Sequence, residues 1–210
     1  MFKKILRPKD KKKERDSKEE KNSVALYLLQ EKFERDEIDF EKMVRIPSGI
    51  DPREWIATHT LGLFHNINQL YDAISEVCTH CRNMNGPEKR RFTWTDDRGK
   101  AIKYSAPQHC AMVFSYCQDK LSDTTLFPTK FGLDFPDDFI DQVQVIIFHL
   151  WTVICHIYQN HWTDVQNLKL KNQLNLIFLH FFNFAKEHAV VPLEELLLLE
   201  PLFRVLTCQN

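Results

Sequence analysis

Apolar residues recur at intervals of three and four over several long stretches of this chain, which is the spacing of one face of a helix. The clearest stripe lies between residues 53 and 77 and consists of Trp55, Ile56, Leu61, Phe64, Ile67, Leu70, Ile74 and Val77. Asp51 is placed to cap this helix, and Pro52 suits its first position, where an N–H group would be unpaired in any case. The pattern predicts a helix from about Arg53 to Val77.

Other stretches carry comparable helical patterns. Helices are predicted over residues 23–34, 105–121, 137–158, 163–188 and 192–206. Ser23 and Ser105 are candidate caps for two of them. Residues 137–158 are apolar on nearly every side, so we expect this helix to be buried at the centre. Pro201 could kink the last helix.

A small β-hairpin is predicted between the helical stretches. Phe92 to Trp94 and Ile102 to Tyr104 carry alternating aromatic residues and flank a turn-forming run, Asp96 to Gly99. No internal repeat is evident. The fold class predicted is all-α, a helical bundle around a long central helix with a minor β-hairpin.

The charge is distributed unevenly. Residues 1–21 carry ten Lys and Arg against five acids, so this segment is +5 and the rest of the chain −6, for a net charge of −1. We predict a disordered basic tail over residues 1–22 and a single domain over residues 23–210. With so little net charge, no general attraction to nucleic acid is expected.

No stretch of the sequence suggests a membrane span of roughly 20 apolar residues, and no secretory signal follows the basic start. We therefore expect a reducing, cytoplasmic location, with nuclear import as a second role for the basic run. The six cysteines should then be thiols or metal ligands. Cys110 and Cys117 share a helix face and suit buried apolar positions.

Two pairs of soft metal ligands are the most specific chemistry in the chain: Cys78-x-x-Cys81 and His156-x4-His161. Two thiolates and two imidazoles suit zinc in a closed tetrahedron. Histidines five apart point about 140° apart on an ideal helix, so the helix would have to distort at His161. His80 is a rival ligand. A redox role for the Cys-x-x-Cys pair would call for a βαβ pattern, which this region lacks.

Several segments, taken in order, resemble the Mob family (Mps-one-binder proteins). They are Val44-Arg45-Ile46-Pro47, Glu54-Trp55-Ile56-Ala57, Phe64-His65-Asn66-Ile67-Asn68, Ser105-Ala106-Pro107, Leu126-Phe127-Pro128-Thr129-Lys130, and His156-Ile157-Tyr158 with His161. The sequence from Trp94 to Gly99 in the predicted hairpin, and the Phe64-His65 pair, are most similar to the sequences of the Mob subclass that serves NDR-type kinases. The resemblance covers about residues 44–205.

The resemblance implies a structural zinc ion held by Cys78, Cys81, His156 and His161. It also implies a Mob-like fold. One departure concerns Cys81: family members usually have four residues between the two cysteines, whereas this chain has two. Two intervening residues chelate zinc well elsewhere.

The resemblance further implies a non-catalytic partner of a kinase. Family members bind a basic helical segment that precedes an AGC kinase domain and stabilise the active kinase. The matching positions are Glu54 and Trp55, and Asp51 adds to the acidic character of this face. We therefore expect Asp51, Glu54 and Trp55 to bind an NDR-type or LATS-type serine/threonine kinase.

Two further departures narrow this expectation. Members that dock phosphothreonine peptides carry a basic trio, for which this chain has Phe148, His149 and Thr152. Phosphate recognition needs permanent positive charge, so no phosphopeptide site is expected. Gly62 replaces an acid found in partners of LATS-type kinases, which argues against kinases of that type.

Three functions remain open from the sequence. The first is a kinase co-activator. The second is an adaptor that does not activate, and that competes with active Mob proteins or belongs to a kinase or phosphatase assembly. The third, a zinc hydrolase, would need an open coordination position, which four protein ligands would close.

Overall fold

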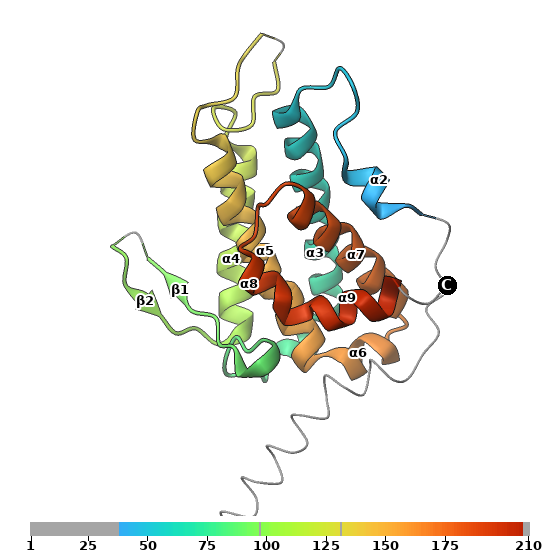
Figure 1. Ribbon diagram of the computed structural model, residues 1–210. Coiled ribbons are helices and arrows are strands. Elements are labelled where there is room, and N and C mark those ends of the chain that lie inside the picture. The colour runs from blue at the N-terminus through green and yellow to red at the C-terminus, as the bar shows by residue number, and fades with distance from the viewer. Residues whose placement is uncertain (1–37, 97, 131, 208–210) are drawn as a thin grey trace, which may run out of the picture. The chain divides into compact units, whose positions relative to one another are not determined.

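The computed structural model describes residues 38–96, 98–130 and 132–207. Within them the chain is mostly helical and carries one two-stranded hairpin, as predicted (Figure 1). The basic tail over residues 1–22 and the helix predicted at residues 23–34 lie outside the described residues.

Helix α3 (Pro52–Cys78) begins where the sequence predicts. The carboxylate of Asp51 accepts a hydrogen bond from the backbone N–H of Arg53 at 2.7 Å, which satisfies one of the unpaired donors of the first turn. Most of the predicted stripe is buried. Leu61 and Val77 are exceptions, at 44% and 40% exposed, because they lie at the edge of the stripe that faces away from the core.

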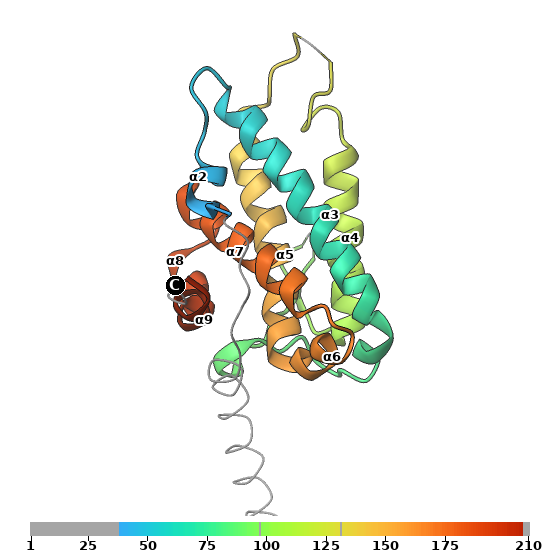
Figure 2. The ribbon, with the colours of Figure 1, turned by 90° about the vertical axis from the view of Figure 1, so that its right-hand side faces the viewer.

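Helix α5 (Phe139–Asn160) is the central helix, as its all-round apolar character predicts. It packs against both α3 and α4 (Ala106–Ser122), and every residue from Leu150 to Tyr158 is buried (Figure 2). In α4, the Gln108 side chain accepts a hydrogen bond from the backbone N–H of Ser105 at 3.1 Å, so the predicted start of this helix is confirmed.

Helix α5 bears on the expectation that the chain has no membrane span. Within the described part of the chain it is the one helix long and apolar enough to cross a membrane by length and composition. Yet 61% of that apolar window is buried inside the protein, as in the core helix of many globular domains. The helix is therefore weak evidence for a membrane span.

The helix predicted over residues 163–188 is two helices, α6 (Trp162–Asn167) and α7 (Lys171–Glu187). The chain reverses at Lys169, which adopts a left-handed φ of 59°. The backbone N–H groups of Lys169 and Leu170 bond to the carbonyls of Gln166 and Val165, at 3.0 and 2.9 Å. These two bonds form a Schellman motif, which ends α6 without the glycine that usually marks such an end.

The last predicted helix, residues 192–206, is also divided. Helix α8 (Leu193–Leu196) leads into a 3₁₀ turn, η2 (Leu197–Leu199), and then into α9 (Glu200–Thr207). Pro201 lies in the first turn of α9, where the missing N–H costs no hydrogen bond. The irregularity therefore precedes the proline.

A short helix, α2 (Phe40–Val44), was not predicted. The Asp39 carboxylate caps it by accepting from the N–H of Lys42 at 3.0 Å. Its two buried residues, Phe40 and Val44, belong to the face that α2 packs against α7. Five residues are too few for a helical period to be recognised.

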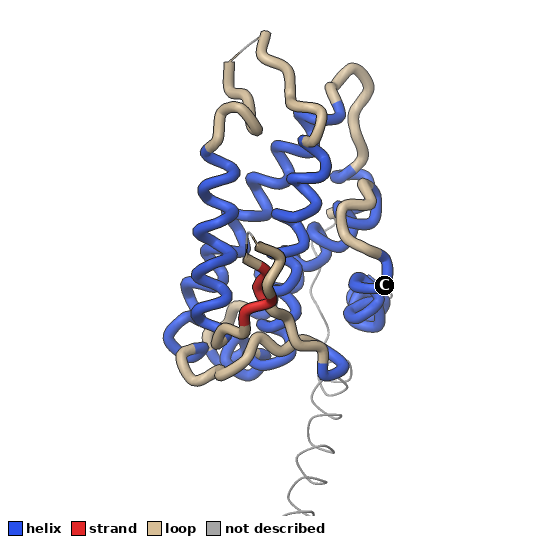
Figure 3. Tube along the Cα trace, turned by 90° about the vertical axis from the view of Figure 1, so that its left-hand side faces the viewer, coloured by secondary structure: helices blue, strands red, loops and turns tan. Residues whose placement is uncertain are grey.

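The hairpin pairs β1 (Trp94–Thr95) with β2 (Ala101–Ile102) in antiparallel register, with Trp94 opposite Ile102. It follows the 3₁₀ turn η1 (Pro87–Lys89) and lies outside the helices (Figure 3). Trp94 is buried because its ring packs against His149, with 4.7 Å between ring centroids. This contact fastens the hairpin to α5.

Candidate metal centre and the start of helix α3

Four side chains from separate parts of the chain converge at one end of α3. Cys78 is the last residue of α3, Cys81 follows it in a loop, and His156 and His161 come from the end of α5. One ligand atom from each residue lies within 4.8 Å of the other three. Cys78, His156 and His161 are buried and Cys81 is half-buried. The sequence-predicted set is therefore assembled in the fold.

The spacing of the four atoms fits zinc. Cys78 Sγ lies 3.5 Å from His156 Nε2, and Cys81 Sγ lies 3.5 Å from His161 Nε2. Zinc bonds of about 2.3 Å to sulfur and 2.0–2.1 Å to nitrogen, at tetrahedral angles, put these atoms about 3.6 Å apart. The cluster has the donor types of a closed tetrahedral site, and its two measured sulfur–nitrogen distances match the edges of such a site.

The end of α5 resolves the difficulty of two histidines five residues apart. The helix ends at Asn160, and His161 has left it, with φ −125° and ψ 16°. On a continuing helix, the His161 side chain would point away from His156. Because His161 lies outside the helix, its ring can turn towards the cluster. His80, the rival ligand, is exposed and lies outside the cluster.

Hydrogen bonds orient both imidazoles. His156 Nδ1 lies 3.1 Å from the carbonyl oxygen of Asn85, and His161 Nδ1 lies 3.0 Å from the carboxylate of Asp164. The Asn160 amide also approaches His156 Nδ1 at 3.0 Å, but its N–H groups donate to the carbonyls of Asn85 and His156. Both Nδ1 atoms thus donate, which leaves each Nε2 lone pair free to bind a metal.

The thiols of Cys78 and Cys81 differ in pKa. Burial raises the pKa of Cys78, but hydrogen bonding with His156, His161 and Tyr71 outweighs it and lowers that pKa to about 6. Burial and the neighbouring Cys78 raise the pKa of Cys81 to about 11. A bound cation favours the thiolate form of both, because deprotonated sulfur is the ligand.

Backbone hydrogen bonds hold the short Cys-x-x-Cys segment in place. The N–H of Cys81 donates to the carbonyl of Cys78 at 2.9 Å, and the carbonyl of Cys81 accepts from Ala106 at 3.0 Å. The second bond ties the ligand loop to the start of α4. Cys110 and Cys117 are fully buried, as predicted, and burial raises the pKa of Cys117 to about 12.

The predicted partner-binding residues lie together at the other end of α3. Asp51 is exposed but uses its carboxylate as the helix cap. Trp55 is half-buried, and its indole N–H donates to the carbonyl of Val44 at 3.0 Å, so it also holds α2 in place. Glu54 is exposed, and its carboxylate has no hydrogen bond or ion pair with any described residue.

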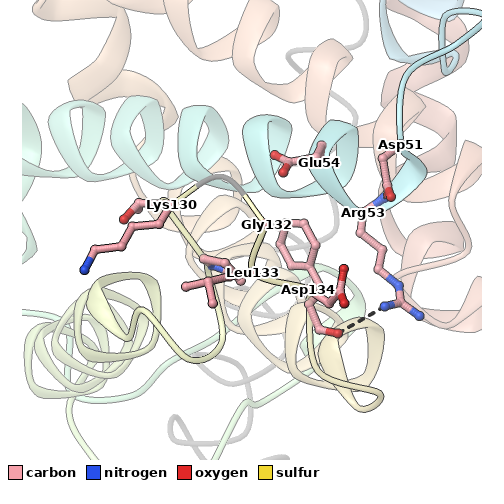
Figure 4. Close-up of a pocket in the computed structure, with 10 residues that line it drawn as sticks. Asp51, Arg53, Glu54, Lys130, Gly132, Leu133 and Asp134 are labelled. Atoms are coloured by element: carbon pink, nitrogen blue, oxygen red, sulfur yellow. Dashed lines mark hydrogen bonds between the residues drawn. The ribbon is translucent and has the colours of Figure 1, made fainter.

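A groove of about 550 Å³ opens beside Glu54 (Figure 4). Its lining comes from the start of α3 and from the loop before α5: Asp51, Arg53, Glu54, Pro128, Thr129, Lys130, Gly132, Leu133, Asp134 and Phe135. Arg53 Nη1 donates to the carbonyl of Phe135 at 3.1 Å and joins the two walls. The loop wall was not anticipated, because nothing in the local sequence says that it meets α3.

The residues at the positions expected for the basic trio are uncharged and packed against their neighbours. Phe148 is half-buried, and Thr152 is buried and donates to the carbonyl of His149 at 2.7 Å. The His149 ring stacks on Trp94, and burial lowers the pKa of His149 to about 4. None of the three offers a permanent positive charge near neutral pH.

Comparisons with known proteins show which family the chain is similar to. The Mob1/phocein family model matches residues 32–199. MOB kinase activator-like 2 of Drosophila melanogaster is 38% identical over 176 residues, which are 82% of this chain and 31% of the fly protein. The chain thus spans about a third of that relative's length.

Two further relatives are covered more fully. MOB kinase activator 2 of Homo sapiens is 37% identical over 172 residues, or 81% of this chain and 72% of the human protein. MOB kinase activator-like 1A of Arabidopsis thaliana is 34% identical over 168 residues, or 78% of each chain.

Proposed function

Because the chain belongs to the Mob1/phocein family, we propose that it is a non-catalytic adaptor that binds and activates a serine/threonine protein kinase. Relatives at 34–38% identity that bear the name MOB kinase activator support this role. The finer proposal is an NDR-type kinase of the NDR/LATS class, bound through the basic segment before its catalytic domain. The similarity of Phe64-His65 and of the hairpin sequence, Trp94 to Gly99, to the Mob subclass that serves NDR-type kinases supports this finer proposal.

The observation that carries the proposal is the free carboxylate of Glu54 at the exposed start of α3. Asp51 and Trp55 fix the backbone around it through the cap and the bond to Val44. A carboxylate held on a rigid helix end can pair with an arginine or lysine of a basic partner segment. Complementary charge of this kind raises the association rate and fixes orientation more than it adds affinity.

We further propose that the metal centre holds zinc and that its role is structural. Four protein ligands close the tetrahedron, so no position is open for water or a substrate. The site joins the end of α3 to the end of α5 and so stabilises the helix that carries Glu54. A scaffold of this kind needs no nucleophile or general base of its own.

A binding experiment with the N-terminal segment of an NDR-type kinase tests the proposal. We expect the wild-type protein to retain this segment and Glu54→Lys to weaken binding about tenfold or more, since reversed charge repels a basic partner. Glu76→Lys is the matched control, an exposed acid at the far end of α3. Equal binding by Glu54→Lys and wild type, or no binding by either, would contradict the proposal.

A second candidate function is a non-activating adaptor that competes with active Mob proteins in a kinase or phosphatase assembly. The uncharged surface at Phe148, His149 and Thr152 favours it, because this surface cannot recruit an upstream phosphopeptide through phosphate. A kinase assay separates the two functions. Binding with stimulation supports the co-activator, and binding without stimulation supports the competitor.

We also propose a location in the cytoplasm and nucleus, with no nucleic-acid partner. The basic residues 1–21 support nuclear entry, and the net charge of −1 argues against general binding to nucleic acid. Imaging of the full chain beside a variant lacking residues 1–22 tests this, and unchanged nuclear signal in the variant would contradict a role for the tail.

A further inference from the structure

The groove beside Glu54 has two walls that are fixed by contacts inside the protein. The guanidinium of Arg53 bonds to the carbonyl of Phe135, and the Phe135 ring packs 4.5 Å from that of Phe139. Phe127, at the start of the loop, packs 5.4 Å from the same ring. These contacts leave the carboxylates of Glu54 and Asp134 unused, so the groove exists before a partner arrives.

The two carboxylates come from opposite walls. Glu54 projects from α3 and Asp134 from the loop (Figure 4). Both residues are exposed, and neither carboxylate has a hydrogen bond or ion pair with another residue of the described ranges. A basic side chain entering the groove therefore meets acceptors from both elements without breaking an existing pair.

An aliphatic side chain lies between them. Leu133 is 55% exposed, among the most exposed large apolar residues of the described chain. It follows Gly132, whose φ of +84° a residue with a side chain would adopt only with strain. The turn thus presents Leu133 towards solvent at the groove, where contact with an apolar partner side chain would remove it from water.

Two cationic side chains also line the groove, Arg53 on the same side as Asp134 and Lys130 at the other end. Figure 4 shows the amino group of Lys130 extending away from Arg53, at the far side of Leu133. A partner with basic residues throughout would meet repulsion there. The groove therefore favours a segment with isolated basic residues over one that is basic throughout.

We propose that this groove binds a partner segment in which a basic side chain pairs with Glu54 and Asp134 and a neighbouring aliphatic side chain packs on Leu133. The inference rests on the proposed function, and it adds the loop before α5 as a second wall of the kinase-binding site. The part of the segment that reaches Lys130 should be uncharged or acidic.

The test measures association and dissociation rates of the full chain with the N-terminal segment of an NDR-type kinase. We expect Asp134→Lys to weaken binding about tenfold, mostly through slower association. Leu133→Ser should weaken it about fivefold, mostly through faster dissociation and with the salt dependence unchanged. Asp119→Lys and Leu168→Ser are matched controls, since both residues are exposed and lie outside the groove.

The outcomes separate the inference from the function beneath it. If Glu54→Lys weakens binding while Asp134→Lys and Leu133→Ser bind as wild type does, the loop wall is overturned and the proposed function stands. If wild-type protein fails to bind any NDR-type segment, both are overturned. Equal losses in the groove variants and in the two controls would also overturn the inference, since the effect would then not be local.

Discussion

Single side chains determine how the proposed metal centre would hold its ion. The cluster joins three buried ligands to a half-buried Cys81, and each imidazole is turned by one acceptor, Asn85 or Asp164. The binding energy of a structural metal is also folding energy, because the unfolded chain does not hold these ligands together. Changes at this scale should therefore be read out both in zinc content and in stability.

Replacing one thiolate tests the centre directly. We expect Cys78→Ser to release zinc and to lower Tm by about 10 °C or more, since several kcal/mol of metal-binding energy are lost from a chain of this size. Elemental analysis and thermal unfolding measure the two effects. Cys117→Ser is the control for loss of a buried thiol outside the cluster. Metal-free wild-type protein of undiminished stability would refute the structural role.

Replacing Asp164, the hydrogen-bond partner of His161, tests what orients the His161 ring. We expect Asp164→Ala to lower zinc affinity about 10–100-fold while the fold persists, because His161 loses the acceptor that fixes its tautomer. Competition with a chromogenic chelator measures the affinity, and circular dichroism checks the fold. Asp164→Asn keeps an acceptor oxygen and should lose less. Unchanged affinity in Asp164→Ala would mean that the hydrogen bond does not position the ligand.

The sequence anticipated the four ligands but not the groups that orient them. Cysteine and histidine spacing carries a recognisable signal, and the departure of His161 from the helix was foreseen as a required distortion. Asn85 lies in a loop whose path depends on the hairpin and α5, so no local pattern marks it. Glu54 was found through the resemblance, whereas Leu133 and Asp134 were missed because the fold alone brings them to α3.

At the scale of helices, two stretches that the hydrophobic pattern predicts as continuous helices are interrupted in the structure. A helical period continues through residues 163–188, yet the Schellman motif at Leu168–Leu170 divides it. Likewise the 3₁₀ turn at Leu197–Leu199 divides the last helix. Neither break carries a glycine, so neither could be located from local sequence. Helices α7 and α9, which follow these breaks, pack against one another.

The left-handed Lys169 offers a test of this break. We expect Lys169→Gly to raise the free energy of unfolding by up to about 1 kcal/mol, because glycine adopts this conformation without steric cost. Lys186→Gly, an exposed position in the last turn of α7, should instead destabilise by up to about 1 kcal/mol. Urea unfolding measures both. Destabilisation by Lys169→Gly would show that its side chain contributes more than the backbone strain removes.

Helices α3 and α7 also share a titrating contact. His59 Nδ1 lies 2.8 Å from His180 Nε2, and Phe184 stacks on His59. Burial and the nearby His59 lower the pKa of His180 to about 4, while burial and His188 lower that of His59. The unfolded chain then binds more protons than the folded one between about pH 6.5 and pH 4.

It follows that stability falls as pH drops through this window. We expect the urea midpoint to decrease from pH 6.5 towards pH 4, and His180→Gln to reduce the slope, because a neutral amide does not titrate. His109 and His149 also have a pKa lowered to about 4 and keep part of the slope in the variant. A slope identical in His180→Gln and wild type would exclude this contact as a contributor.

For the whole molecule, the hydrophobic pattern was sufficient to predict an all-α bundle around α5 with a minor hairpin. The order of elements and the central position of α5 follow from where apolar residues cluster. What could not be predicted was the pairing of distant surfaces, since α2 against α7 and the loop against α3 leave no periodic signal. The charge balance was evident from composition alone.

That balance predicts how partner binding responds to salt. Residues 22–210 carry a formal charge of −6, so a basic kinase segment should be attracted over distances comparable with the Debye length, about 10 Å at 0.1 M salt. We expect the association rate to fall as salt rises from 50 to 500 mM, with little change in dissociation. Stopped-flow mixing measures both rates. An association rate independent of salt would contradict this electrostatic attraction.

The metal centre has a consequence for the order of folding. Its two ligand pairs stand about 75 residues apart, and joining them in an unfolded chain costs roughly 4 kcal/mol of loop-closure entropy. If both pairs bind zinc before the core packs, the metal-binding energy offsets this entropy early in folding. The ends of α3 and α5 are then brought together before the helices pack. Refolding should then be faster when zinc is added before dilution from denaturant than when it is added afterwards.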